Sequence, residues 1–280
     1  MDKRRAAGEA AETASSCANY YDINQETSRE LNKMLLLRSE PIAVKLAKSE
    51  KDIPADAVKP TRDMNKHLAL CQAFALARRD RKTIYMDKND HWCWNPLIGL
   101  GHVECLEGSE PFEVVCRYLG ISDPKAARSF FAGFPRLPLG EFIGIVTAPL
   151  CSAVFKPDLL LIYSGNIQLR SMVWAVKHKT GKLVETQLDA IDSCIYACVP
   201  PIISGEYRVT LPDFGESERA MAGEDEIILS VPGERIEELL DGLREFYKRD
   251  MGYAHRHREM QYDFTQPEFY ETLFRMWGLD

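Results

Sequence analysis

The sequence predicts a single mixed domain of the α/β or α+β class, built from two weakly similar halves. Segments with the apolar spacing of strands alternate with segments of helical spacing from residue 21 to residue 280, and no low-complexity linker divides them. Such interleaving is typical of the mixed classes. The two halves are the stretches 40–105 and 157–205, and a helical C-terminal segment is expected over 251–280. A chain of 280 residues, 45% of them hydrophobic, is long enough to bury the core that this fold needs.

Residues 1–20 differ in composition from this domain. They begin basic and continue rich in Ala, Glu and Ser, and Glu9 and Glu12 interrupt the apolar centre that a secretory signal needs. We therefore expect a disordered leader or tag-like tail here, and a cytoplasmic protein. The net charge of −7 argues against a nucleic-acid partner. No apolar run approaches the length of a membrane span, so no membrane partner is expected.

The elements of the first half follow from caps and periodicity. Thr27 and Glu30 have the spacing of a capping box, which predicts a helix over 27–38. Pro41 ends this helix, and the alternating residues that follow predict a strand over 41–46. The other elements expected before residue 142 are a helix over 65–79, a strand over 82–86, a short helix between Ser109 and Gly120, and another after Asp123.

The second half has the pattern of several strands and two amphipathic helices. Leu169, Met172 and Val176 share one face of a helix that Gly181 closes. A second amphipathic helix is predicted over 236–247. Strands are expected over 142–150, 157–163, 182–186, 206–211 and 225–232.

A weak internal repeat connects the halves. At an offset of one hundred residues, Ile84 aligns with Val184, and one further inserted residue aligns Cys93 with Cys194. Few identities support this alignment, so chance similarity is the alternative. If the repeat is real, the halves pack around a pseudo-two-fold axis and the two cysteines face one cleft. Clefts of this kind are common ligand sites.

Several motifs together resemble a known family. The motifs are "EPIAVKL" (40–46), "LCQAFALARRDRKTIYM" (70–86), Cys93 before "LIGLG" (97–101), "APL" (148–150), "KPDLLLIY" (156–163), Gln168, Cys194 with Pro200, and "DEIILSVPGERIEELLDGL" (225–243). Over residues 27–245 the chain resembles the bacterial and archaeal family known as domain of unknown function 169. The resemblance implies the extent of the domain and no reaction.

The resemblance also points to a glycine–arginine element. "FGESER" (214–219) matches it, with Gly215 and Arg219 at the two positions. Many relatives carry a cysteine beside that glycine, whereas this chain has Asp213 followed by Phe214. Any role assigned to that cysteine is therefore in doubt here.

Four cysteines are candidate metal ligands. Cys194 and Cys198 have i,i+4 spacing and share one helical face, and Cys71 and Cys93 complete a set that could bind zinc or an iron–sulfur cluster. The alternative is that these cysteines fill the core, because cysteine is among the most buried residue types. The chain contains no Cys-x-x-Cys, so the spacing is a weak signal.

Cys93 and Cys194 are also the candidate catalytic thiols. Cys93 follows His91 and lies between Trp92 and Trp94, and a nearby base would make its thiolate available. The alternative is that the two tryptophans shield the thiol or form the wall of a pocket.

Four further residues are candidates for cofactor binding. Gly99 and Gly101 form a Gly-x-Gly turn, Gln168 belongs to the family motifs, and the planar fork of Arg219 suits an anion. The alternatives are a tight turn for the glycines and a surface ion pair for Arg219.

These observations predict a protein that binds a small molecule or cofactor in a cleft between the two halves. If it is an enzyme, thiol- or metal-dependent redox chemistry is the first expectation. The alternative is a non-catalytic cofactor carrier, ligand sensor or accessory subunit. The pattern specifies neither a substrate nor an oligomeric state.

Overall fold

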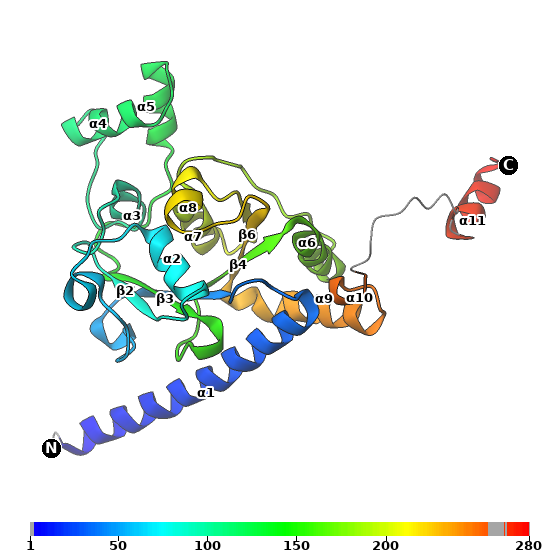
Figure 1. The fold of residues 1–280 in the computed structure, drawn as a ribbon, viewed down its shortest axis with the longest axis horizontal. Helices are drawn as coiled ribbons and strands as arrows, with labels where there is room; N and C mark the ends of the chain where they lie inside the picture. Colours follow the sequence, from blue (N-terminus) through cyan, green and yellow to red (C-terminus); the bar gives the residue numbers. More distant parts are fainter. Residues whose placement is uncertain (1–2, 257–265, 267, 280) are drawn as a thin grey trace.

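The computed structural model describes residues 3–256, 266 and 268–279, and its centre is one six-stranded sheet (Figure 1). The strand order is β2-β3-β1-β4-β6-β5, and every neighbouring pair is antiparallel. The strands are β1 (Ile42–Ala47), β2 (Ile84–Met86), β3 (Gly144–Pro149), β4 (Leu159–Gly165), β5 (Arg208–Thr210) and β6 (Glu226–Pro232). The predicted mixed class is confirmed.

The strands alternate their side chains between two separate cores. In β1, Ile42 and Val44 enter one cluster of buried residues, whereas Ala43 and Ala47 enter the other. In β4, Leu161 joins the same cluster as Ile42 and Val44. Successive side chains of a strand point to opposite faces of the sheet. Because both the odd and the even positions of these strands are apolar, both faces of the sheet must be covered.

The first face, which we call the site face, packs against the helices that carry most of the candidate residues. The helices whose residues join its core are α2 (Leu70–Arg78), α3 (Trp94–Gly99), α4 (Glu110–Tyr118), α5 (Pro124–Ala132) and α7 (Ser193–Ser204). Helix α8 (Phe214–Arg219) contacts α2 on this side. Short helical turns η1 (Glu50–Asp52), η2 (Pro60–Met64), η3 (Leu150–Ser152) and η4 (Gly233–Arg235) complete the connections.

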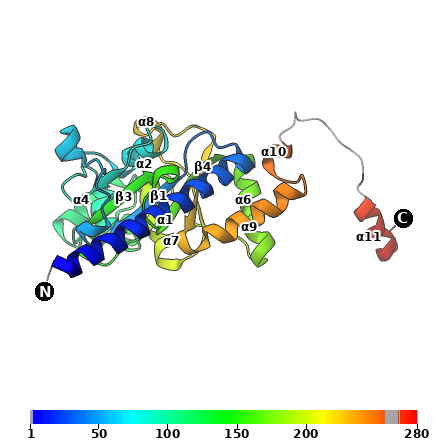
Figure 2. The ribbon, with the colours of Figure 1, turned by 90° about the horizontal axis from the view of Figure 1, so that it is seen from below.

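The opposite face is covered by long helices. They are α1 (Lys3–Leu35), α6 (Asn166–Thr180) and α9 (Ile236–Lys248), with α10 (Tyr253–Arg256) against all three. Figure 2, which looks at the molecule from below, shows α1 crossing in front of β1 and β3. Helix α11 (Glu268–Trp277) follows near the C-terminus. No helix in the described part of the chain has both the length and the apolar character of a membrane span.

One long helix, α1, makes up the N-terminal region. It begins at Lys3, and the expectation of a disordered leader or tag-like tail over 1–20 stays a prediction. The capping box predicted at Thr27 is wrong, because Thr27 lies inside α1 and is buried. The Ala, Glu and Lys residues upstream have high helix propensity, which allows the helix to extend past an internal cap signal.

The expected strand over 182–186 is also absent, since these residues have no regular structure. They run beside β5 through side-chain contacts in place of a backbone ladder. Thr186 Oγ1 donates to the carbonyl of Val209 at 2.7 Å, and Arg208 Nη2 donates to the carbonyl of Gln187 at 2.6 Å. Of the expected helical segment 251–280, α10 and α11 are helical, and residues 257–265 lie outside the described part.

The sheet has the same order from either edge when β1, β2 and β3 are matched with β4, β5 and β6. This matching differs from the alignment at an offset of one hundred, which pairs β2 with residues 182–186. It makes α2 and α7, which precede β2 and β5 on the site face, the equivalent helices. Cys71 and Cys194, the second residues of these helices, are then the equivalent cysteines, in place of Cys93 and Cys194. A relationship between the halves stays a prediction.

Candidate functional site

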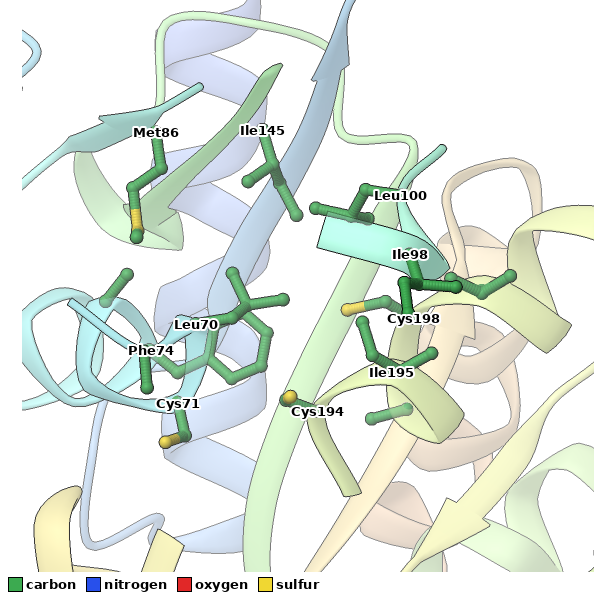
Figure 3. Packing of buried hydrophobic residues seen from close by; sticks show 14 of the residues in the cluster. Leu70, Cys71, Phe74, Met86, Ile98, Leu100, Ile145, Cys194, Ile195 and Cys198 are labelled. Carbon is green, nitrogen blue, oxygen red and sulfur yellow. The ribbon is translucent and has the colours of Figure 1, made fainter. Parts of the chain in front are cut away.

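Three thiols from separate elements come close together on the site face. Cys71 is the second residue of α2, Cys93 caps the start of α3, and Cys194 is the second residue of α7. Charge on Cys71 or Cys93 raises the pKa of Cys194, so all three sulfurs lie within electrostatic range of one another. Figure 3 shows Cys71 and Cys194 on facing helices. We call these residues the thiol cluster.

A buried carboxyl network lies beside the thiol cluster. Glu216 of α8 accepts a hydrogen bond from Tyr163 of β4 at 2.8 Å and one from the hydroxyl of Ser193 at 3.0 Å. Asp213 caps α8 by accepting from the backbone N–H of Glu216 at 2.8 Å, and it also accepts from the backbone N–H of Ser193 at 3.0 Å. The network therefore joins the central sheet to the N-termini of α7 and α8.

Burial governs the ionisation of this network. Glu216 and Asp192 are fully buried, and desolvation raises the pKa of each carboxyl to about 7. The nearby negative charge of Asp213 raises the pKa of both further. Since an ordinary carboxyl is ionised at neutral pH, these two are unusual in being able to hold a proton there.

A short relay connects one thiol to one of these carboxyls. Cys93 Sγ donates to Asn95 Oδ1 at 3.4 Å, and Asn95 Nδ2 donates to Asp192 Oδ1. The second oxygen of Asp192 is buried and has no hydrogen-bond partner within the described chain. The relay gives Cys93 a fixed orientation and a polar link to the protonatable carboxyl.

The sequence interpretation missed Asn95, Asp192, Asp213 and Glu216. The spacing of Asp213 and Glu216 is that of a capping box, and this signal was available in the chain. Asp192 had no comparable signal, because its burial depends on packing between α3 and α7.

The thiols are protonated in this environment. Burial raises the pKa of Cys71 to about 12 and the pKa of Cys194 well above its ordinary value. Burial also raises the pKa of Cys93, although the charge of Arg219 acts in the opposite direction. A nucleophilic cysteine needs a lowered pKa, so this arrangement favours thiols that pack and donate hydrogen bonds over an activated thiolate.

The predicted set of four cysteine metal ligands is not found as a metal site. The described residues contain no group of three or more His, Cys, Asp or Glu side chains placed to hold a metal ion. Cys198 lies one turn farther along α7, buried in the apolar core, and only Glu216 among nearby charges affects its pKa. The i,i+4 spacing therefore places Cys198 in the packing of the helix against the sheet.

Three of the predicted cofactor residues have structural contacts. A Cβ on Gly99 would lie 2.7 Å from Ile195, so this glycine allows α3 to approach α7. Gly101 has a positive φ of 71°, which only glycine adopts without strain. Gln168 lies on the opposite face and donates to the carbonyls of Leu35 and Leu36 at 2.8 and 3.1 Å, which caps the end of α1. Gln168 therefore does not join the thiol cluster.

Replacing Gly101 by alanine is expected to lower the free energy of unfolding by about 2 kcal/mol. The added Cβ would lie 2.5 Å from the backbone oxygen of Pro138, in addition to the strain of the positive φ. Gly140 has the same φ of 71° with open space around it, so Gly140→Ala is a matched control with an expected loss of about 1 kcal/mol. Urea denaturation measures both, and equal losses would contradict the packing role of Gly101.

An open pocket lies beside the thiol cluster, on the outer side of α2. Its volume is about 530 Å³, and we call it the Trp92 pocket. Three cations contribute to its lining and only one carboxylate does: Lys66, Arg79 and Arg219 against Asp80. The Arg219 guanidinium lies 5.5 Å from the centre of the Trp92 ring, and Trp92 Nε1 donates to Gln72 at 3.2 Å.

Arg219 and Trp92 link this pocket to Cys93. Trp92 is adjacent to Cys93 in sequence, and the charge of Arg219 slightly offsets the rise in the Cys93 pKa that burial causes. Of the predicted site residues, Cys71, Cys93, Cys194 and Arg219 are thus brought together, whereas Gln168 and Cys198 are not part of the group.

Comparison with known proteins adds a family and no activity. The family model DUF169, described as "Uncharacterised ArCR", matches residues 30–242. The uncharacterized protein MJ0308 of Methanocaldococcus jannaschii is 23% identical to the chain over 231 residues, which cover 80% of this chain and 96% of that protein. No solved structure matches the chain significantly.

Proposed function

We propose that this chain, which belongs to the uncharacterised family DUF169, binds a small anionic molecule in the Trp92 pocket. The observation that carries this proposal is the charge of the pocket. The whole chain has a net charge of −7, yet the lining of this pocket has three cations and one carboxylate. A local reversal of charge in a concave site favours an anion.

Two of the three cations are available to a ligand. Arg219 is exposed, and neither it nor Lys66 has a carboxylate partner among the residues described. Arg79 is held in place, because its Nη2 donates to the carbonyl of Met221 at 2.5 Å. A guanidinium within cation–π distance of an indole still has N–H groups that can pair with a carboxylate or phosphate.

The size and lining of the pocket suit a small organic anion. Ligand pockets commonly have volumes of about 300–1,000 Å³. Leu68, Ala75 and Leu76 supply apolar surface next to the cations, and Trp92 is half exposed. These features support a ligand with one anionic group and a compact apolar or planar part.

The protonated thiols favour a non-catalytic version of this function, such as a ligand sensor or carrier. The convergence of Cys71, Cys93 and Cys194 supports thiol-dependent redox chemistry as the second candidate. The two versions differ in the alkylation rate of Cys93, which is slow in a sensor and fast in a thiol enzyme. Either version suits the cytoplasm as the proposed compartment, because its reducing conditions keep thiols free.

Replacing Arg219 by alanine is expected to weaken anion binding by roughly tenfold or more, since a charge-assisted hydrogen bond contributes about 1.5–3 kcal/mol. Isothermal titration calorimetry with inorganic pyrophosphate and with citrate measures the effect. Arg170→Ala is the matched control, because Arg170 is exposed on α6 at the opposite face. The proposal is wrong if neither anion binds the unmodified protein, or if Arg219→Ala binds both as tightly.

A further inference from the structure

Two histidines that the site above does not use lie against each other. His91 follows Asp90 and pairs by a backbone bridge with Leu68, and His102 follows the turn at Gly101. Their ring centres are 5.8 Å apart, and the ring planes differ by 33°. His102 lines a pocket of about 630 Å³ that does not include Trp92.

Three of the four ring nitrogens of this pair are buried without a hydrogen-bond partner among the described residues. His91 is only 6% exposed, and both of its nitrogens are buried without a hydrogen bond within the described chain. His102 Nε2 is buried and unpartnered in the same way. Leaving a buried polar atom unsatisfied costs roughly 1–3 kcal/mol, so three such atoms in one place indicate that another species meets them.

Both rings are neutral at physiological pH. Burial lowers the pKa of His91 to about 3, and burial also lowers the pKa of His102. A neutral imidazole keeps one nitrogen lone pair, which is the form that binds a transition metal ion. Asp87 contributes negative charge near His102, and that charge favours a cation at this position.

The spacing of the rings also fits a shared metal ion. A zinc ion bound to imidazole nitrogen at about 2.1 Å in a tetrahedral site places the two ring centres roughly 5–6 Å apart. The observed separation of 5.8 Å lies in this range. Direct ring stacking would instead bring the planes parallel, whereas these planes are tilted.

We propose that His91 and His102 together bind one divalent transition metal ion of the zinc class at the edge of the pocket that His102 lines. In the part of the chain described, no third His, Cys, Asp or Glu completes the site. Water or an anionic ligand would fill the remaining coordination positions, and the pocket that His102 lines is a route by which such a ligand could enter. This arrangement resembles the open positions of catalytic metal sites more than a closed structural site.

The site is independent of the Trp92 pocket. His91 and Trp92 are neighbours in sequence, but Trp92 lines one pocket and His102 lines the other. Failure of anion binding at Arg219 would thus leave the metal proposal standing, and failure of metal binding would leave the anion proposal standing.

Titration of the full chain with Co²⁺, followed by its visible spectrum, tests the proposal. We expect one Co²⁺ ion per chain with d–d bands and without the charge-transfer band that thiolate ligands produce. His91→Phe and His102→Phe replace each imidazole by a ring without nitrogen. Each is expected to weaken Co²⁺ binding by at least roughly tenfold, because even loss of an outer-shell partner costs a metal site about 10–100-fold in affinity.

His178→Ala is the matched control, since His178 is exposed on α6 at the opposite face and should leave Co²⁺ affinity unchanged. The remaining histidines are kept in every protein, so any metal they bind is common to all titrations. Thermal unfolding with and without Zn²⁺ gives a second measurement, in which only proteins with both His91 and His102 should gain stability. Unchanged affinity in both phenylalanine variants, or a thiolate charge-transfer band, would overturn the proposal.

Discussion

Replacing Arg78 by alanine is expected to lower the free energy of unfolding by about 3–5 kcal/mol, because it removes the closest cation from the buried carboxylate of Glu226 and leaves only the more distant Arg79, at 3.9 Å. The Arg78 side chain is only 1% exposed and pairs with Glu226, which is 3% exposed, at 3.1 Å. Arg78 also donates to the carbonyl of Met221 at 3.0 Å, and its guanidinium lies 4.1 Å from the centre of the Tyr163 ring. One side chain thus connects α2, β6 and the tyrosine that holds Glu216.

Urea denaturation at pH 7 measures this loss. Arg249→Ala is the control, because Arg249 pairs with Glu245 at the surface, with exposed fractions of 57% and 35% for the two side chains. A surface pair of this kind contributes less than about 1 kcal/mol. If Arg78→Ala lowers the free energy of unfolding by no more than Arg249→Ala does, the buried pair does not stabilise the contacts of α2 with β6 and Tyr163.

The second large effect concerns pH. Glu216 has its pKa raised from 4.5 to about 7 by burial, so the folded protein holds a proton that the unfolded chain releases between these values. The stabilisation from this proton is fully present below pH 4.5 and is lost as the pH rises through 7. With about 1.4 kcal/mol per pKa unit, Glu216 accounts for roughly 3 kcal/mol of this loss. Asp192, with its pKa raised from 3.8 to about 7, acts in the same direction.

Glu216→Gln is expected to flatten the decline of stability between pH 5 and pH 8. Glutamine resembles the protonated acid and cannot lose a proton, so its stability relative to the unmodified protein should improve by roughly 3 kcal/mol from pH 5 to pH 8. Urea denaturation across this range gives the slope. Glu234→Gln is the control, because that side chain is 82% exposed and should leave the slope as it is. An identical slope for Glu216→Gln would show that Glu216 is ionised throughout.

Local signals in the sequence predicted many of the helix ends correctly. Ser109 caps α4 by accepting from the backbone N–H of Phe112, and Asp123 caps α5 just before Pro124. Gly181 ends α6 in the left-handed conformation. These signals depend on neighbours within a few residues, so the sequence contains all the information they need.

Features that depend on distant partners could not be predicted in the same way. Residues 182–186 alternate like a strand, but whether they pair depends on the neighbouring β5, which they contact through side chains. The order of the strands in the sheet also depends on long-range pairing, so the sequence could not show it. That order makes Cys71 of α2 equivalent to Cys194 of α7, whereas the sequence alignment paired Cys93 with Cys194.

The candidate site also contains residues that the sequence pointed to and residues that only the structure revealed. Residue type, the family motifs and the internal repeat singled out Cys71, Cys93, Cys194 and Arg219, and the structure places these residues on the site face. The carboxyls of Asp192 and Glu216 went unnoticed because their unusual chemistry comes from burial between helices that are far apart in sequence. The state of the thiols was missed for the same reason, since desolvation raises their pKa values.

The measurement that tests the central claim most directly is the NMR signal of the Trp92 indole N–H during titration with inorganic pyrophosphate. The chain has four tryptophans, of which Trp92 lines the charged pocket and Trp174 lies on α6 at the opposite face. We expect a saturable shift of the Trp92 signal, no shift for Trp174, and loss of the Trp92 response in Arg219→Ala. A Trp92 signal that stays in place while pyrophosphate binds elsewhere would contradict the assignment of this pocket as the anion site.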